Sequence, residues 1–288
     1  MKKEPASNAA TVKKLPARAA EDGGATMKSL RASLKLLDHF VAGTHRDLSV
    51  GELTALSGLS KATVSKALSA FAQSGILVQD GESRRYSVGP RAYVLGSRFL
   101  MQDSLCSMAF PVMHDLVART GHSARLSTMD GDRVLYMLGL EGPWFVNSGW
   151  RAGTWLAAQS TTAGRVMLAF LADKDAKRIM AQAIRPLTEH TILDKTKIRQ
   201  IIANARVTGF AAQRNEANRG LGTVSVPLFG PGRTLLGALS LVFPSHVIAP
   251  EQDAALAAEL HRSASVISQR SGCAVYPFGQ GLPQRMSA

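Results

Sequence analysis

Apolar residues recur at spacings of three and four from Met27 onward, a pattern typical of one buried face of an α-helix. The stripe is formed by Leu30, Leu34, Leu37, Phe40 and Val41. Ser49 and Glu52 have the spacing of a capping box, in which each side chain bonds the backbone amide of the other residue. A short second helix is expected behind this cap, with Leu53 and Leu56 facing inward.

A third helix is expected over residues 61–73, because Ser60 is a suitable N-cap and a regular inner face follows it. That face is made of Val64, Ala67, Leu68 and Phe71. Two short strands, 76–79 and 84–88, are joined by the turn signal Asp80-Gly81. Three helices with a glycine-containing turn before the third, followed by a small hairpin, are the order of a winged helix-turn-helix.

The remaining pattern mixes helices with hairpins instead of alternating them regularly. Helices are expected at 90–101, 108–119, 160–171, 173–183, 194–207 and 250–269, and strands at 123–129, 133–140, 222–229 and 234–243. This order predicts an α+β domain around an antiparallel sheet. The expected division is a disordered tail (1–26), a winged helix-turn-helix domain (27–89), a linker helix (90–106), a larger α+β domain (107–271) and a flexible tail (272–288).

The composition is ordinary for a soluble globular protein, with 45% hydrophobic and 19% charged residues. No apolar run approaches the roughly 18–20 residues that span a bilayer, and the first 20 residues lack the apolar stretch of a secretory signal. The two cysteines, Cys106 and Cys273, are far apart, which argues against a disulfide framework or a cysteine-rich metal site. A cytoplasmic protein without a membrane partner is expected.

The formal net charge of +13 favours a polyanionic partner, because Lys and Arg that neutralise phosphates drive nucleic-acid affinity. The charge is not concentrated in the first domain, however. Residues 27–90 carry eight Lys/Arg against five Asp/Glu, whereas residues 91–288 carry 21 against 13. Net charge alone therefore supports DNA binding only weakly, and the helix-turn-helix pattern carries that prediction.

In a helix-turn-helix the third helix enters the major groove with its N-terminal part against the base edges. Its outward positions here include Lys61, Thr63, Ser65 and Lys66. The last three are expected near bases and the first nearer the backbone. In the wing, Arg84 and Arg85 suit a minor-groove or phosphate contact. These side chains also fit the solvated face of a small helical domain, and the two wing arginines favour DNA.

Several motifs occur in the order of one known family. They are LSVGEL at 48–53, GLSKATV at 58–64, RYSVG at 85–89, DGDRVLY at 130–136, STTAGRVMLA at 160–169, RVTGFAAQRNE at 206–216 and GALSL at 237–241. Over residues 27–269 the chain resembles IclR-type bacterial regulators. The resemblance implies that residues 107–271 form a GAF-like effector-binding and oligomerisation domain. It also implies assembly as a dimer or dimer of dimers, and a palindromic operator.

The resemblance also places the effector between the start of the helix at 160–171 and the later strands. The corresponding residues are Thr162, Ala163, Gln213, Thr223 and Ser240. A helix N-terminus favours an anion, so a carboxylate is expected there. The chain departs from the family where Gln159 replaces a usual histidine, Arg165 a usual lysine, and Arg214 and Asn215 usual acidic residues. These departures favour a ligand other than the simplest organic acids.

Trp144, Phe145, Trp150 and Trp155 could wall the pocket, which favours an aromatic acid, but a place in the core or in a dimer interface fits them equally. The expected function is a ligand-responsive transcriptional repressor or activator of a catabolic operon, without cofactor or metal. The sequence contains none of the HExxH, G-x-S-x-G or P-loop motifs, which argues against an enzyme. A DNA-packaging protein would not need the second domain.

Overall fold

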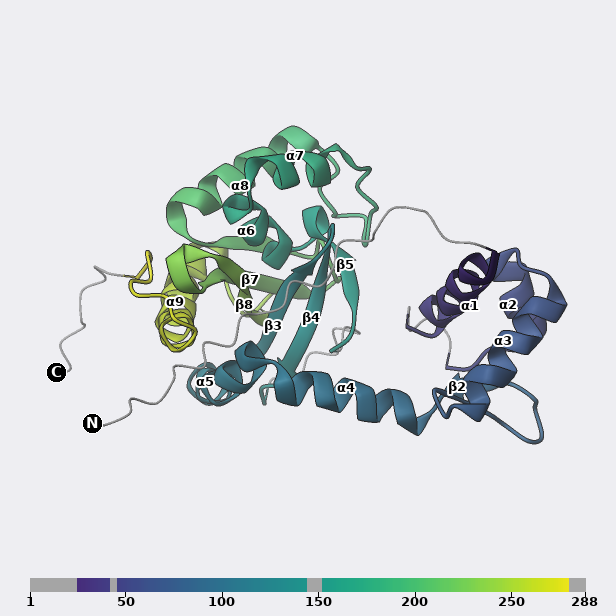
Figure 1. Ribbon diagram of the computed structural model, residues 1–288. Coiled ribbons are helices and arrows are strands. Elements are labelled where there is room, and N and C mark those ends of the chain that lie inside the picture. Colours follow the sequence, from purple (N-terminus) through teal and green to yellow (C-terminus); the bar gives the residue numbers. More distant parts are fainter. Residues whose placement is uncertain (1–24, 42–45, 144–151, 280–288) are drawn as a thin grey trace, which may run out of the picture. The chain divides into compact units, whose positions relative to one another are not determined.

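The computed structural model describes residues 25–41, 46–143 and 152–279 (Figure 1). They fall into two compact units, 25–102 and 103–279. The predicted N-terminal tail up to residue 24 and the last part of the predicted C-terminal tail, 280–288, lie outside the described residues. The same holds for Trp144, Phe145 and Trp150.

The N-terminal unit has the elements expected of a winged helix-turn-helix. They are α1 (Ala25–Val41), α2 (Val50–Ser57), α3 (Lys61–Gln73), the antiparallel strands β1 (Leu77–Gln79) and β2 (Tyr86–Val88), and α4 (Pro90–Gln102). The predicted capping box is present, because Ser49 Oγ accepts from the Glu52 amide and the Glu52 carboxylate accepts from the Ser49 amide. Ser60 caps α3 by accepting from the Thr63 amide.

Tertiary contacts rotate the expected buried face of α1. Leu36 and Phe40 are the buried positions of this helix, and they pack with Leu53, Val64 and Leu68. The predicted inward residues Leu30, Leu34 and Val41 are instead about half exposed, and so is Leu56 of α2. Leucines cover more than one face of α1, so periodicity alone does not select the face that the other two helices cover.

The hairpin of the wing is shorter and its loop longer than expected. Asp80 and Arg85 close the loop, since the Asp80 amide donates to the Arg85 carbonyl. Within it, Asp80 Oδ1 accepts from both the amide and the hydroxyl of Ser83. The two-residue turn predicted at Asp80-Gly81 is therefore wrong, because the Asp80 side chain organises a wider loop over residues 81–84.

The C-terminal unit is built on a six-stranded antiparallel sheet in the order β5-β4-β3-β8-β7-β6. The strands are β3 (Ser123–Asp130), β4 (Arg133–Leu140), β5 (Trp155–Ala157), β6 (Ala211–Arg214), β7 (Leu221–Phe229) and β8 (Leu235–Pro244). The helices are α5 (Ser104–Thr120), α6 (Thr162–Phe170), α7 (Asp173–Ala181), α8 (Lys195–Thr208) and α9 (Asp253–Arg270). The α+β prediction is confirmed, whereas the two short edge strands β5 and β6 were not anticipated.

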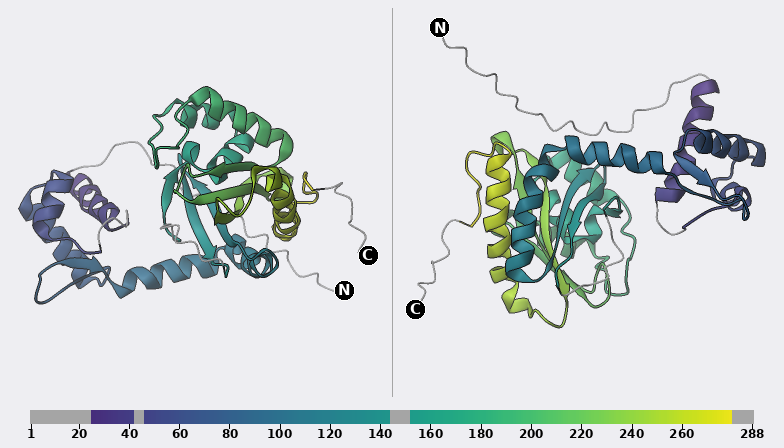
Figure 2. Two further views of the ribbon diagram at one scale, coloured as in Figure 1. Left: turned by 180° about the vertical axis from the view of Figure 1, so that it is seen from behind. Right: turned by 90° about the horizontal axis from the view of Figure 1, so that it is seen from below.

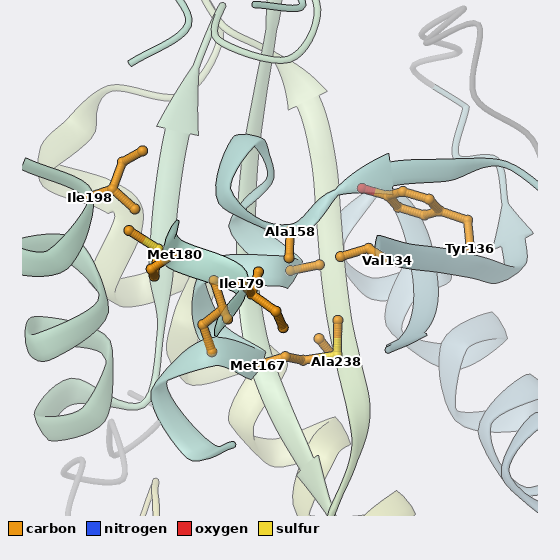
Figure 3. Packing of buried hydrophobic residues seen from close by; sticks show 10 residues of the cluster. Val134, Tyr136, Ala158, Met167, Ile179, Met180, Ile198 and Ala238 are labelled. Atoms are coloured by element: carbon orange, nitrogen blue, oxygen red, sulfur yellow. The ribbon is translucent and has the colours of Figure 1, made fainter. Parts of the chain in front are cut away.

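Helices cover both faces of this sheet. Helices α5 and α9 pack together on one face, and α6, with α8 against it, lies on the other (Figures 1 and 2). The core under α6 gathers Val134, Ala158, Met167 and Ala238 with residues of α7 and α8 (Figure 3). A Cβ at Gly164 would lie 2.1 Å from the Ala158 carbonyl oxygen, so only glycine lets the preceding chain run so close to α6.

Two predicted segments differ in the structure. The linker helix expected over 90–106 is interrupted at Asp103, whose carboxylate accepts from the Cys106 amide and so begins a new helix. The segment after Gly272, expected to be flexible, packs against the domain as far as residue 279. Its Tyr276 is buried and donates a hydrogen bond to the Pro227 carbonyl, and Phe278 stacks on His261.

Candidate functional site

The N-terminal half of α3 presents the side chains expected to contact DNA. Lys61, Ser65 and Lys66 are exposed, and within the described ranges neither ammonium group is paired with a carboxylate. Thr63 is only half-buried, and its hydroxyl lies 2.9 Å from Ser60 Oγ, so part of its hydrogen-bonding capacity goes to the helix cap. The arrangement leaves two cations and one free hydroxyl on the outward face of the helix.

The two wing arginines differ in their surroundings. Arg85 Nη2 lies 2.8 Å from Glu52 Oε2, and Arg85 Nε donates to the Asp47 carboxylate. Backbone and side-chain hydrogen bonds from Ser49 and Arg85 hold the pKa of Glu52 down at about 2, and the two carboxylates raise the pKa of Arg85. Arg84 is exposed, with a left-handed backbone (φ 57°), and no ion pair to it occurs in the described part of the chain.

Arg85 therefore ties the wing to the start of α2, and its charge is already compensated. The expectation that it contacts DNA stays a prediction, and the geometry gives it a second role that sequence reasoning missed. Asp47 precedes the capping box and stands 38 residues before Arg85, so no local pattern indicates the pair. The antiparallel pairing of Leu48 with Tyr86 brings the two segments together.

A small pocket, partly open to solvent, lies between the start of α6 and the sheet of the C-terminal unit. It is lined by Arg125, Tyr136, Thr162, Gln213, Ala217, Asn218, Leu221, Thr223, Ser240 and Val242. Sheet register explains why residues so far apart in sequence meet here, because directly paired residues project from the same face. Arg125 pairs with Ser240, while Gln213, Thr223 and Val242 form the neighbouring row.

Four of the five residues expected at the effector site line this pocket: Thr162, Gln213, Thr223 and Ser240. Ala163 is buried and does not line it. Ser225 lies beneath, donating to Thr162 Oγ1 (2.8 Å) and sharing a 2.7 Å hydrogen bond with Ser240 Oγ. The hydroxyls of Thr162 and Ser240, both expected at the effector site, are thus linked through the hydroxyl of Ser225.

Gln213 brings unused hydrogen-bonding capacity to the pocket. Its side chain is buried, and its Oε1 has no hydrogen-bond partner among the described residues. A buried acceptor without a partner costs free energy, so a donor supplied by a bound molecule would be favoured there. Burial also raises the pKa of the Tyr136 hydroxyl, which lines the same pocket and therefore stays protonated there.

Sequence reasoning missed Arg125, the charged side chain of this lining. It is buried, and its Nη2 donates to Glu141 Oε1 over 2.6 Å. A signal did exist, because an arginine inside a strand whose neighbours are apolar is seldom buried without a partner. The partner itself is set by strand pairing, since Glu141 directly follows the strand β4 beside Arg125.

The residues that depart from the family pattern have structural partners next to the pocket. Gln159 Nε2 donates to the Ile179 carbonyl, and Arg165 forms a fully buried ion pair with Glu216 (2.6 Å). Trp155, expected to wall the pocket, does not line it, and its Nε1 donates to Asp130. The other three aromatic residues expected there, Trp144, Phe145 and Trp150, lie outside the described part of the chain. Tyr136, which was not among the expected residues, lines the pocket.

Within the described ranges, no group of three or more His, Cys, Asp or Glu residues is placed to hold a metal ion. In the same ranges, no helix combines the length and the apolar character required to cross a bilayer.

Comparison with known proteins agrees with this architecture. The model of the IclR helix-turn-helix domain matches residues 29–81, and that of the bacterial transcriptional regulator IclR C-terminal domain matches residues 98–269. The HTH-type transcriptional regulator KdgR of Dickeya chrysanthemi is 28% identical over 237 residues, covering 82% of this chain and 78% of the relative.

Two solved structures illustrate the likeness. An IclR transcriptional regulator from Alicyclobacillus acidocaldarius has a TM-score of 0.76 at 25% identity, covering 85% of this chain and 99% of that one. An IclR homolog from Microbacterium hydrocarbonoxydans complexed with 4-hydroxybenzoate has a TM-score of 0.71 at 19% identity, covering 84% and 98%. Families and relatives alike are transcriptional regulators and not enzymes, and the chain belongs to the IclR family of DNA-binding bacterial transcriptional regulators.

Proposed function

We propose that this regulator binds operator DNA as a homo-oligomer, a dimer or a dimer of dimers, and that a small organic acid in the pocket of the C-terminal unit sets its DNA affinity. Its place would be the bacterial cytoplasm, where the DNA is, and its target a catabolic operon. The observation that carries the proposal is a partly open pocket whose buried Gln213 Oε1 has no hydrogen-bond partner in the part of the chain that the structure describes.

The lining favours an acid with further polar groups. Thr162 opens α6, so the positive end of the helix dipole faces the pocket and favours a carboxylate. Gln213 Oε1 would accept from a hydroxyl on the ligand, and the Thr223 hydroxyl offers a further contact. A hydroxylated acid uses these groups best, because its hydroxyl can donate to Gln213 Oε1. An aromatic acid remains in the tests because one relative was solved with 4-hydroxybenzoate.

Assembly is supported by the surface of α4. None of its residues is buried, and Tyr93, Leu95 and Met101 are more than half exposed. Apolar side chains gathered on one helix favour burial against another chain. A two-fold assembly would present two α3 helices to two half-sites of a palindromic operator. Ligand binding would then shift the population between assemblies that fit the operator and assemblies that do not.

The test is a fluorescence-anisotropy titration of the full-length protein against the intergenic DNA upstream of its own gene. Titrations at two salt concentrations are repeated with pyruvate, D-gluconate and 4-hydroxybenzoate. Sequence-selective binding that one acid changes by about fivefold or more would support the proposal. Weak binding that is indifferent to sequence and vanishes at the higher salt concentration would overturn it.

A further inference from the structure

The guanidinium of Arg125 is held by hydrogen bonds from within the protein. Nη1 donates to the carbonyl of Ala124 over 3.0 Å, and Nη2 donates to Glu141 Oε1 over 2.6 Å. Gly139, directly opposite on β4, leaves the room for it, because a Cβ there would lie 3.3 Å from Cδ, Nε and Nη1. These hydrogen bonds fix the arginine in the pocket wall.

The two partners of this ion pair differ sharply in exposure. The side chain of Arg125 is 4% exposed, whereas that of Glu141 is 42% exposed. A buried cation left without a counter-charge is strongly destabilising, while a half-exposed carboxylate is readily hydrated. Arg125 therefore always requires an anion, but Glu141 does not require Arg125.

We propose that Glu141 is an internal counter-ion that the carboxylate of the effector displaces from Arg125. This inference rests on the proposed function and names the group of the pocket that recognises the acid. If both carboxylates stayed, two negative charges would share one guanidinium. If Glu141 moves into solvent, the buried charge remains balanced and the ion pair keeps a short, charge-assisted hydrogen bond.

The exchange would reach the backbone beyond the pocket. Glu141 Oε2 also accepts from Ser123 Oγ (2.8 Å), and Ser123 Oγ accepts from the Gly142 amide (3.2 Å). Gly142 is pressed against the chain before β3, where a Cβ would lie 2.3 Å from the Gly121 carbonyl oxygen. Release of Glu141 frees Ser123 at the first residue of β3 and so links the charge of the ligand to the end of the sheet.

The test uses acetate, a small and chemically stable carboxylate, as the probe. Thermal unfolding of the full-length protein is followed against acetate at constant ionic strength set with chloride, with acetamide as the neutral isostere. In Glu141→Gln the internal competitor loses its charge, so the half-saturating acetate concentration is expected to fall about fivefold or more. The matched control is Glu259→Gln, which removes an ion-paired carboxylate on α9.

A second variant separates Arg125 from other anion sites. The double substitution Arg125→Gln/Glu141→Gln removes both charges together and leaves no unpaired ion, so the fold is retained. It is expected to lose the saturable acetate shift. The proposal is overturned if Glu141→Gln, like the control Glu259→Gln, has the same half-saturating acetate concentration as the unaltered protein. It is also overturned if the double variant still shows the lowered half-saturating concentration expected for Glu141→Gln.

The outcome is independent of the DNA titration. If organic acids change operator binding while acetate binding ignores Glu141, the counter-ion role fails and the proposed regulator stands. If acetate exchange behaves as expected but no acid affects DNA binding, the proposed function fails and the pocket chemistry stands.

Discussion

The two wing arginines provide the most discriminating test of the DNA-binding surface. Arg84 has no carboxylate partner in the described ranges, whereas Arg85 is shared between Asp47 and Glu52. If Arg84 of each wing contacts a phosphate, neutralisation of that phosphate releases counterions from the DNA. Each such contact adds about 0.9 to the magnitude of the slope of log affinity against log salt concentration. Arg85 is already neutralised and contributes little to that slope.

The expected magnitudes follow from this difference. Between 50 and 200 mM salt, one such contact changes affinity about 3.5-fold, and two wings change it about 12-fold. Arg84→Ala should therefore weaken binding mainly at low salt and flatten the slope by about 1 per wing. Arg85→Ala should weaken DNA binding by the same factor at 50 mM as at 200 mM salt, because it releases the wing from α2 without removing an uncompensated cation.

The assay is anisotropy with operator DNA over five or more salt concentrations, with Arg199→Ala on α8 as a control that removes an arginine outside the N-terminal unit. The reasoning is refuted if Arg85→Ala flattens the slope as much as Arg84→Ala does. That result would mean that Arg85 leaves its carboxylates to meet the DNA.

Three further outcomes are expected. Gln213→Leu should leave the stability unchanged or raise it by about 1 kcal/mol in thermal unfolding, because it removes a buried acceptor without a partner, and should abolish the response to the acid; a clear loss of stability would contradict this. Glu216→Ala should lower the free energy of unfolding in urea by about 3–5 kcal/mol, because it leaves Arg165 buried and unpaired. The double variant Arg165→Met/Glu216→Leu should recover most of this stability, and an equal loss in the single and double variants would be incompatible with a buried-charge penalty. Burial among aromatic rings lowers the pKa of His261 from 6.5 to about 4, so the fold holds it neutral while the unfolded chain takes up a proton below pH 6.5. Stability should therefore decrease by about 3 kcal/mol as the pH falls from 6.5 to 4, and His261→Gln should remove that slope; an unaltered slope would assign it to other groups.

Local chemistry made much of the fold predictable. The capping box of Ser49 and Glu52, the N-cap Ser60 and the hairpin around Asp130 are decided within a few residues, and the structure confirms them. The wing loop was missed because the Asp80 side chain competes with the tight turn that the Asp80-Gly81 pair favours. The edge strands β5 and β6 were missed because they are too short to show a period.

What the sequence by itself determined is therefore the kind of protein: a winged helix-turn-helix joined to an α+β domain, with four residues of its pocket identified through family motifs. The tertiary structure alone decided the charge pairs. Arg125 with Glu141 and Arg165 with Glu216 lie at or next to the pocket, and Arg85 with Asp47 lies at the wing. The partners in these pairs stand 16 to 51 residues apart. Periodicity and capping act within one or two helical turns, whereas a buried charge finds its partner only after strands and helices have packed.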